Sequence, residues 1–160
     1  MPIGRTLFIT LLALLLNGAT PAPALAKVKA RKSSSITLQP SNHHQFPMFS
    51  VRYEGSISDV NSAWGSLAYG GYNSAIITNF SLGYRRYVSG NFSSGWFLSP
   101  FLSSTKISAG SRGATFNALC ATYGGKHIFR SGFTLEGELG AGVSSSGLAI
   151  VGEAGLGWSF

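Results

Sequence analysis

The residues of this sequence that could carry chemistry are its charged side chains, which make up only 11% of the 160 residues. Apolar and polar residues alternate around them, and because successive strand residues point to opposite faces of a sheet, such alternation separates the two kinds. Six charged residues fall on the polar side of their segments: Arg52, Glu54, Arg85, Glu136, Glu138 and Glu153. The sequence therefore predicts that one face of a sheet gathers two guanidinium groups and four carboxylates.

Glu136 and Glu138 are the pair that could act as acid–base catalysts, since residues two apart on one strand face come close enough to perturb each other's ionisation. An enzyme would also need a nucleophile or a base, and no His, Ser or Cys lies at a diagnostic spacing from this pair. We therefore interpret the six charged residues as a mutually neutralising structural network. We expect neither a catalytic residue nor a cofactor.

The other residues with reactive side chains give no second site. His43 and His44 are neighbours in the sequence, and neighbouring residues of an extended chain point apart, so we expect no metal site there. Cys120 is the single cysteine, which forbids an internal disulfide bond. We expect it to be a small packing residue.

The elements that must position these residues are strands, because period-two alternation recurs along the chain and no segment has a helical period. The predicted strands cover residues 35–39, 48–55, 63–69, 75–87, 95–104, 114–129, 133–143 and 148–160. Stretches with Gly, Pro, Ser or Asn at 40–47, 56–61, 88–94 and 105–113 are predicted to be breaks between strands. An even number of strands places both ends of a closed sheet on the same side.

The first 26 residues have the features of a secretory signal peptide. Arg5 precedes an apolar stretch of about 11 residues, and a stretch with Pro, Gly and small residues ends in Ala24-Leu25-Ala26. The apolar stretch is too short for a membrane-spanning helix, which needs about 20 residues. We expect cleavage before Lys27, and so export of a chain whose residues 27–34 form a basic flexible tail and whose residues 35–160 form one domain.

The net charge of +7 comes largely from this tail and the signal peptide. We expect the tail to be a solvated periplasmic arm, with attraction to anionic lipid head groups as the alternative. The rest of the chain is nearly balanced in charge, and an exported protein meets no nucleic acid in normal service. We therefore expect no nucleic-acid partner.

The placement of charge favours a membrane barrel over a soluble one. No window of 18 consecutive apolar residues follows the signal peptide, which excludes a helical membrane protein. A soluble ligand-binding barrel would carry many charges outside, whereas a lipid-facing Arg or Lys costs about 2–4 kcal/mol near the bilayer midplane. The sequence therefore predicts an all-β fold, an antiparallel up-and-down transmembrane β-barrel of about eight strands, with charges in its lumen. A barrel of eight strands is just wide enough for side chains to fill, so we expect no open pore.

Residues near the predicted strand ends fit the two membrane interfaces. His127 shares a strand end with Lys126 and Arg130, and we expect contact with head groups there. Aromatic residues that we expect in interfacial girdles are Tyr53, Trp64, Tyr69, Tyr84, Tyr87, Trp96 and Trp158.

The last predicted strand, 148–160, alternates most regularly and ends in an aromatic residue. Leu156, Trp158 and Phe160 share its apolar face. This pattern resembles the C-terminal signal of bacterial outer-membrane barrels, which their insertion machinery reads. The resemblance implies that these three residues form such a signal.

Longer segments carry a wider resemblance, to the small outer-membrane β-barrel superfamily that includes the OmpA transmembrane domain, OmpX and opacity-type proteins. These segments are FSVRYEGSISD, FSLGYRRYVSG with GWFLSPFL, and GGKHIFRSGFTLEGELGAG, within about Ile36 to Phe160. The resemblance implies a monomer in the outer membrane, surrounded by its lipids and lipopolysaccharide and inserted by the barrel-assembly machinery. These families lack a common activity, so the fold alone does not name a function.

The sequence therefore supports a non-enzymatic integral outer-membrane protein with a structural or surface-interaction role. Two alternatives stay open. One is an outer-membrane barrel enzyme that modifies lipids, and the other is a soluble periplasmic ligand-binding barrel. Known barrel deacylases of lipid A carry His, Ser and Glu on their outer face, but His127 and Ser131 do not reproduce the His-x-Ser spacing.

Overall fold

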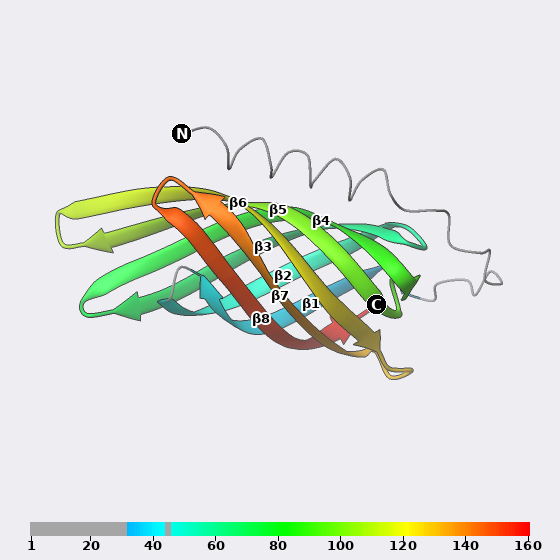
Figure 1. Cartoon of the computed structure of the whole chain (residues 1–160). Helices are drawn as coiled ribbons and strands as arrows, with labels where there is room; N and C mark the ends of the chain where they lie inside the picture. Colours follow the sequence, from blue (N-terminus) through cyan, green and yellow to red (C-terminus); the bar gives the residue numbers. More distant parts are fainter. Residues whose placement is uncertain (1–31, 44–45) are drawn as a thin grey trace, which may run out of the picture.

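The computed structural model describes residues 32–43 and 46–160, which form eight strands joined by short turns (Figure 1). The strands are β1 Ser34–His43, β2 Phe46–Ser58, β3 Asn61–Tyr72, β4 Ala75–Asn91, β5 Ser94–Ala109, β6 Arg112–Ile128, β7 Phe133–Ser144 and β8 Gly147–Ser159. The expected signal peptide at 1–26, and the part of the basic tail that precedes Lys32, lie outside the described residues. Within the described residues no helix is long and apolar enough to cross a membrane.

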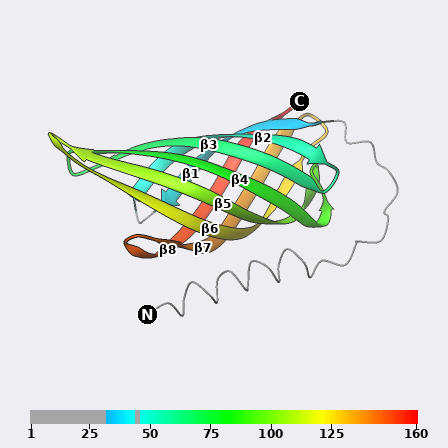
Figure 2. The same ribbon diagram turned by 90° about the horizontal axis from the view of Figure 1, so that it is seen from above.

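The strands close into one antiparallel barrel in sequence order, which confirms the predicted fold class of an all-β, up-and-down barrel (Figure 2). Closure occurs where β1 meets β8, with Ile36 opposite Trp158. The amide groups of Ser33 and Ser34 both donate to the carbonyl oxygen of Phe160 at 3.1 Å, so the start of β1 and the end of β8 lie at the same end of the barrel. Closure leaves no long sheet edge along the body of the barrel.

Several strands are longer than the sequence predicts. The expected break at 40–47 is wrong in its first part, because β1 continues through Pro40 to His43. Pro40 pairs with Phe49 of β2, while the pairing of β1 with β8 is interrupted between Leu38 and Ser41. The interruption accommodates the missing amide donor of the proline.

The expected loop at 105–113 is also wrong. β5 and β6 continue as a hairpin as far as the pair Ala109 and Arg112, which leaves a two-residue turn in which Gly110 has a φ of 58°. The predicted break at 88–94 is shortened in the same way, because β4 extends to Asn91. Pairing with a partner strand holds the polar residues of these extended ends in strand conformation.

The long strands β4, β5 and β6 make the barrel uneven at the end away from Phe160. β6 pairs with β5 as far as Arg112, but with β7 only from Ala118 onward. Residues 112–117 therefore form a short free edge on a projecting hairpin. Figure 1 shows this yellow-green β5–β6 hairpin reaching well beyond the orange β7–β8 hairpin.

The barrel is polar inside and apolar outside. The burial of residues alternates over the body of the barrel, and the outward positions hold exposed large apolar side chains such as Phe49 and Leu148, each 78% exposed. The interior holds mostly Ser, Thr, Arg and Glu side chains. A small apolar cluster inside consists of Trp64, Phe101, Ala118, Cys120 and Val151, which places Cys120 as a buried packing residue.

Candidate functional site

The candidate site is a buried cluster of ionised side chains in the lumen, which we call the lumen network. Its members come from five strands: Arg52 and Glu54 on β2, Arg85 on β4, Lys126 on β6, Glu136 and Glu138 on β7, and Glu153 on β8. All seven residues are buried, the most accessible being 7% exposed. The structure thus brings together the six residues that the alternation placed on one face, and adds a seventh.

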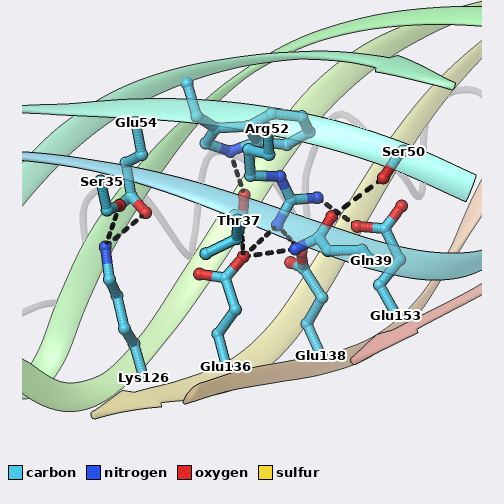
Figure 3. A network of polar contacts seen from close by, with 12 residues as sticks. Ser35, Thr37, Gln39, Ser50, Arg52, Glu54, Lys126, Glu136, Glu138 and Glu153 are labelled. Atoms are coloured by element: carbon cyan, nitrogen blue, oxygen red, sulfur yellow. Dashed lines mark hydrogen bonds and ion pairs between the residues drawn. The ribbon is translucent and has the colours of Figure 1, made fainter. Parts of the chain in front are cut away.

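Arg52 is the centre of one half of the lumen network (Figure 3). Its Nη1 contacts Glu138 Oε1 and lies 3.3 Å from Glu136 Oε1, and its Nη2 contacts Glu153 Oε2. The guanidinium carbon lies 4.1 Å from the ring centre of Trp64, so the cation also rests on an aromatic face. One side chain of β2 thereby joins β7 and β8 across the lumen.

Arg85 holds the other half. Its Nη1 lies 2.6 Å from Glu54 Oε2 and 2.9 Å from Glu136 Oε2, and its Nη2 lies 2.9 Å from Glu138 Oε1. Glu136 and Glu138 therefore each bind both arginines. Because each carboxylate is shared, the two halves form one connected network rather than two separate pairs.

Lys126 corrects a sequence-based expectation. We expected it at a strand end beside lipid head groups, but it points into the lumen, where its Nζ lies 2.9 Å from Glu54 Oε2 and 2.8 Å from Ser35 Oγ. The signal was present in the sequence, since Lys126 shares its parity with Cys120 and Thr122, which are also buried. Proximity to a strand end obscured this alternation.

Neutral side chains complete the coordination of the carboxylates. Thr37 donates to Glu136 at 3.0 Å, Thr122 donates to Glu138 at 2.5 Å, and Tyr87 donates to Glu54 at 3.1 Å. Gln39 and Ser62 contribute further hydrogen bonds, to Glu136 and Glu54. Among the described buried side-chain nitrogen and oxygen atoms, only the Nε atoms of the two arginines lack a partner. Such saturation offsets the high cost of removing ions from water.

The geometry indicates a bracing role for these side chains. Three cations and four carboxylates from five strands meet in the lumen, with their ionised groups engaged by one another. A catalytic carboxylate pair would instead face a space that admits a substrate. The arrangement therefore occupies the interior and links strands that are far apart in the sequence.

Two residues that we expected in the interfacial girdles lie inside the barrel, so that expectation is wrong for them. Trp64 and Tyr87 are 3% and 4% exposed, and Trp64 donates from Nε1 to Ser99 Oγ at 2.9 Å. Gly83 makes room for the Trp64 ring, since a Cβ atom there would lie 2.4 Å from it. Tyr53, Tyr69, Trp96 and Trp158 are exposed on the outside, as expected.

The terminal segment lies on the outer face. Leu156, Trp158 and Phe160 are all exposed, while the intervening Ser159 is buried. Trp158 is paired with Ile36 of β1 and Phe133 of β7, at the seam where the barrel closes. These residues are therefore available to a partner outside the barrel.

His127 forms a hydrogen bond on the outer face that sequence reasoning did not predict. Its Nδ1 lies 2.9 Å from the Oγ of Ser94. A Ser-His pair of this kind needs an acidic or amide residue to orient the imidazole for catalysis. Of the described acidic residues, the four glutamates point into the lumen, on the other side of the sheet, and Asp59 lies in the turn after β2. The Ser-His-acid arrangement of a barrel hydrolase is not assembled by the described residues.

The architecture is that of a small, closed, antiparallel barrel of eight strands. Its fold is similar to the structure of the outer-membrane protein Ail of Yersinia pestis in a phospholipid bilayer nanodisc, with a TM-score of 0.50. That match has 14% sequence identity and covers 81% of this chain and 100% of Ail. The crystal structure of Ail, the attachment invasion locus protein of the same organism, matches with a TM-score of 0.49 and 14% identity, over 81% of this chain and 97% of Ail. No protein-family model and no curated protein matches the sequence.

Proposed function

We propose that this chain is an integral outer-membrane β-barrel without enzymatic activity, which serves envelope integrity or surface interaction. The observation that carries the proposal is the inverted distribution of side chains. Polar and charged side chains make up most of the interior, and the outward face is apolar over the body of the barrel. An apolar exterior of this extent is unfavourable in water, whereas contact with the lipid of a bilayer requires an apolar surface.

The same observation disfavours a soluble ligand-binding barrel. Such a protein would need an apolar interior for its ligand and a charged exterior for solubility. Outside the lumen network, the described residues carry five basic side chains and one acidic one, Asp59. The similarity to the Ail fold supports the membrane reading at the level of architecture.

The shape supports a surface-interaction role and a fixed orientation. Even-numbered outer-membrane barrels keep short turns on the periplasmic side and longer excursions outside. The projecting β5–β6 hairpin lies at the end away from Phe160, so that end faces the cell exterior in this proposal. Its exposed tip carries Lys106 and Arg112, which favours acidic partners such as the phosphates of lipopolysaccharide.

Fractionation of cells that express the full-length chain tests the location. The mature protein should start at Lys27, co-sediment with outer membranes and run at a different position on a gel when it is not boiled. Recovery in the soluble periplasm, or identical mobility of boiled and unboiled samples, would contradict the barrel in the membrane.

Two further measurements test the absence of a pore and of an activity. Vesicles that contain the folded protein should stay impermeable to small sugars, because side chains occupy the lumen. Mass spectrometry of lipid A and phospholipids should give the same species with and without expression. New lipid species would establish the barrel enzyme instead. We also propose that the protein is a monomer inserted by the barrel-assembly machinery, and cross-linking in cells checks both points.

A further inference from the structure

A groove lies on the outer face of the barrel, near the end that carries Phe160. It has a volume of about 610 Å³ and is lined chiefly by the ends of β5, β6 and β7, with Ser89 and Gly90 of β4 at one side. Pockets that bind small molecules commonly have volumes of about 300–1,000 Å³. Lys126 and Glu136 also line the groove, although their side chains point to the other side of the sheet, into the lumen network.

Two glycines form the floor of the groove. Gly125 on β6 and Gly137 on β7 are cross-strand partners, and Ala154 on β8 continues the same row. A Cβ atom built on Gly137 would find its nearest neighbour 3.7 Å away, so the space above this residue is open. The surrounding outward positions carry large side chains, which makes the row a depression in the surface.

An aromatic side chain forms one wall. Trp96 of β5 lies opposite Gly125, and its ring is stacked on Tyr123 with ring centres 5.6 Å apart and an angle of 6° between planes. Leu135 of β7 lines the other side of the floor. Stacking fixes the tryptophan ring beside the depression, so the groove has a rigid apolar wall.

Polar groups stand at the end of the groove that faces the turns. The hydrogen-bonded pair Ser94 and His127 lies there. The ring of His127 packs edge-on against the ring of Phe129, with the two ring centres 4.6 Å apart. Arg130, exposed in the turn between β6 and β7, follows within three residues. An apolar trough that ends in hydroxyl and imidazole groups, with an exposed arginine in the adjoining turn, matches a molecule with a hydrocarbon chain and an anionic head.

We propose that this groove binds one phospholipid of the periplasmic leaflet. The acyl chain lies over Gly137, against the ring of Trp96 that covers Gly125, and the phosphate is held by His127 and Ser94 with Arg130 of the adjoining turn. The site rests on the proposed membrane location, because the groove faces the bilayer only if the barrel is inserted. Its position beside the periplasmic turns selects phospholipid over the lipid A of the opposite leaflet.

Quenching of Trp96 fluorescence by brominated lipid tests the site. The full mature chain carries Trp158→Phe, so that Trp96 is the only tryptophan on the outer face, since Trp64 lies in the lumen. It is folded into phosphatidylcholine vesicles with 10 mol% of phosphatidylglycerol that has brominated acyl chains. We expect quenching at least two-fold above the value for random mixing of the lipids.

Gly137→Leu fills the groove and should reduce the quenching to the random value. Gly65→Leu is the matched control, because Gly65 also lies on the outer face but on β3, away from the groove. The site would be overturned if the protein with Gly137 intact gave only the quenching expected for random mixing of the lipids. Excess quenching that persists in Gly137→Leu would overturn it too. No quenching by any brominated lipid would instead contradict membrane insertion, so failure of the site and failure of the proposed function are distinguishable.

Native mass spectrometry in mild detergent provides a measurement that does not depend on the folding of Gly137→Leu. The unaltered protein should retain one phospholipid per chain, and the double variant His127→Ala, Arg130→Ala should retain at least five-fold less. Retention of none by the unaltered protein, or equal retention by both, would overturn the proposal.

Discussion

Glu138 and Glu153 are direct cross-strand partners on β7 and β8, and both side chains point into the lumen, where Arg52 contacts each of them. Like charges directly opposite each other destabilise a strand pair. The guanidinium group of Arg52, on β2, therefore offsets the repulsion between these two carboxylates on β7 and β8.

Replacing a lumen arginine should destabilise the barrel strongly. Arg52→Leu or Arg85→Leu leaves buried carboxylates without their counter-ion, which costs about 3–5 kcal/mol for a fully buried pair. Urea unfolding in detergent measures the difference. Arg112→Leu at the exposed hairpin tip is the matched control and should leave the midpoint unchanged. Equal midpoints for lumen and tip variants would show that the lumen network does not stabilise the fold.

The excess of one carboxylate makes the members of the lumen network unequal. Glu153→Gln keeps the shape and balances three carboxylates against three cations, so it should cost less stability than Glu138→Gln, which removes a ligand shared by both arginines. Lys126→Met should cost more than either, because it increases the negative excess. Unfolding midpoints in the order Glu153→Gln, Glu138→Gln, Lys126→Met, from highest to lowest, check this ranking. A reversed order would contradict the charge count.

Gly83→Ala should disturb the aromatic support of Arg52. The new Cβ would lie 2.4 Å from the ring of Trp64, so the ring must move, and overpacking of this kind costs about 1–3 kcal/mol. The emission spectrum of Trp64, recorded in a Trp96→Phe, Trp158→Phe background, and the urea midpoint both report the change. Gly65→Ala on the outer face is the control, because its nearest neighbour is a flexible Leu82 side chain at 3.2 Å.

We propose that Leu156, Trp158 and Phe160 form an assembly signal, which predicts that they matter before the barrel is closed. Phe160→Ala should lower the amount of protein that reaches the outer membrane at low expression, while refolding of the purified chain in detergent stays nearly normal. Removing this side chain loses apolar burial against the membrane, which costs at most about 1.5–3 kcal/mol of stability. Phe49→Ala, which also removes an exposed outward phenylalanine, should leave cellular assembly unchanged. Equal effects of the two substitutions would refute the signal.

The strand ends and the interior aromatics show where sequence reasoning stops. Pro40 and the glycines near 110 suggested breaks, but pairing with β2 and within the β5–β6 hairpin carries the strands through or beyond them. The residue types of Trp64 and Tyr87 favour the membrane interface, although their parity places them inside. The preference of a residue type for the interface predicts its position less well than alternation does, because the lumen also accommodates aromatic side chains.

The sequence by itself determined which residues point inward, since period-two alternation is a local property of an extended chain. It thereby specified an all-β fold with six charges on one face, and an apolar opposite face. Only the tertiary structure decided that Arg52 meets Glu136, Glu138 and Glu153, and that Lys126 meets Glu54. These contacts join residues 72 to 101 positions apart, and they depend on strand register and barrel closure, which no local pattern encodes.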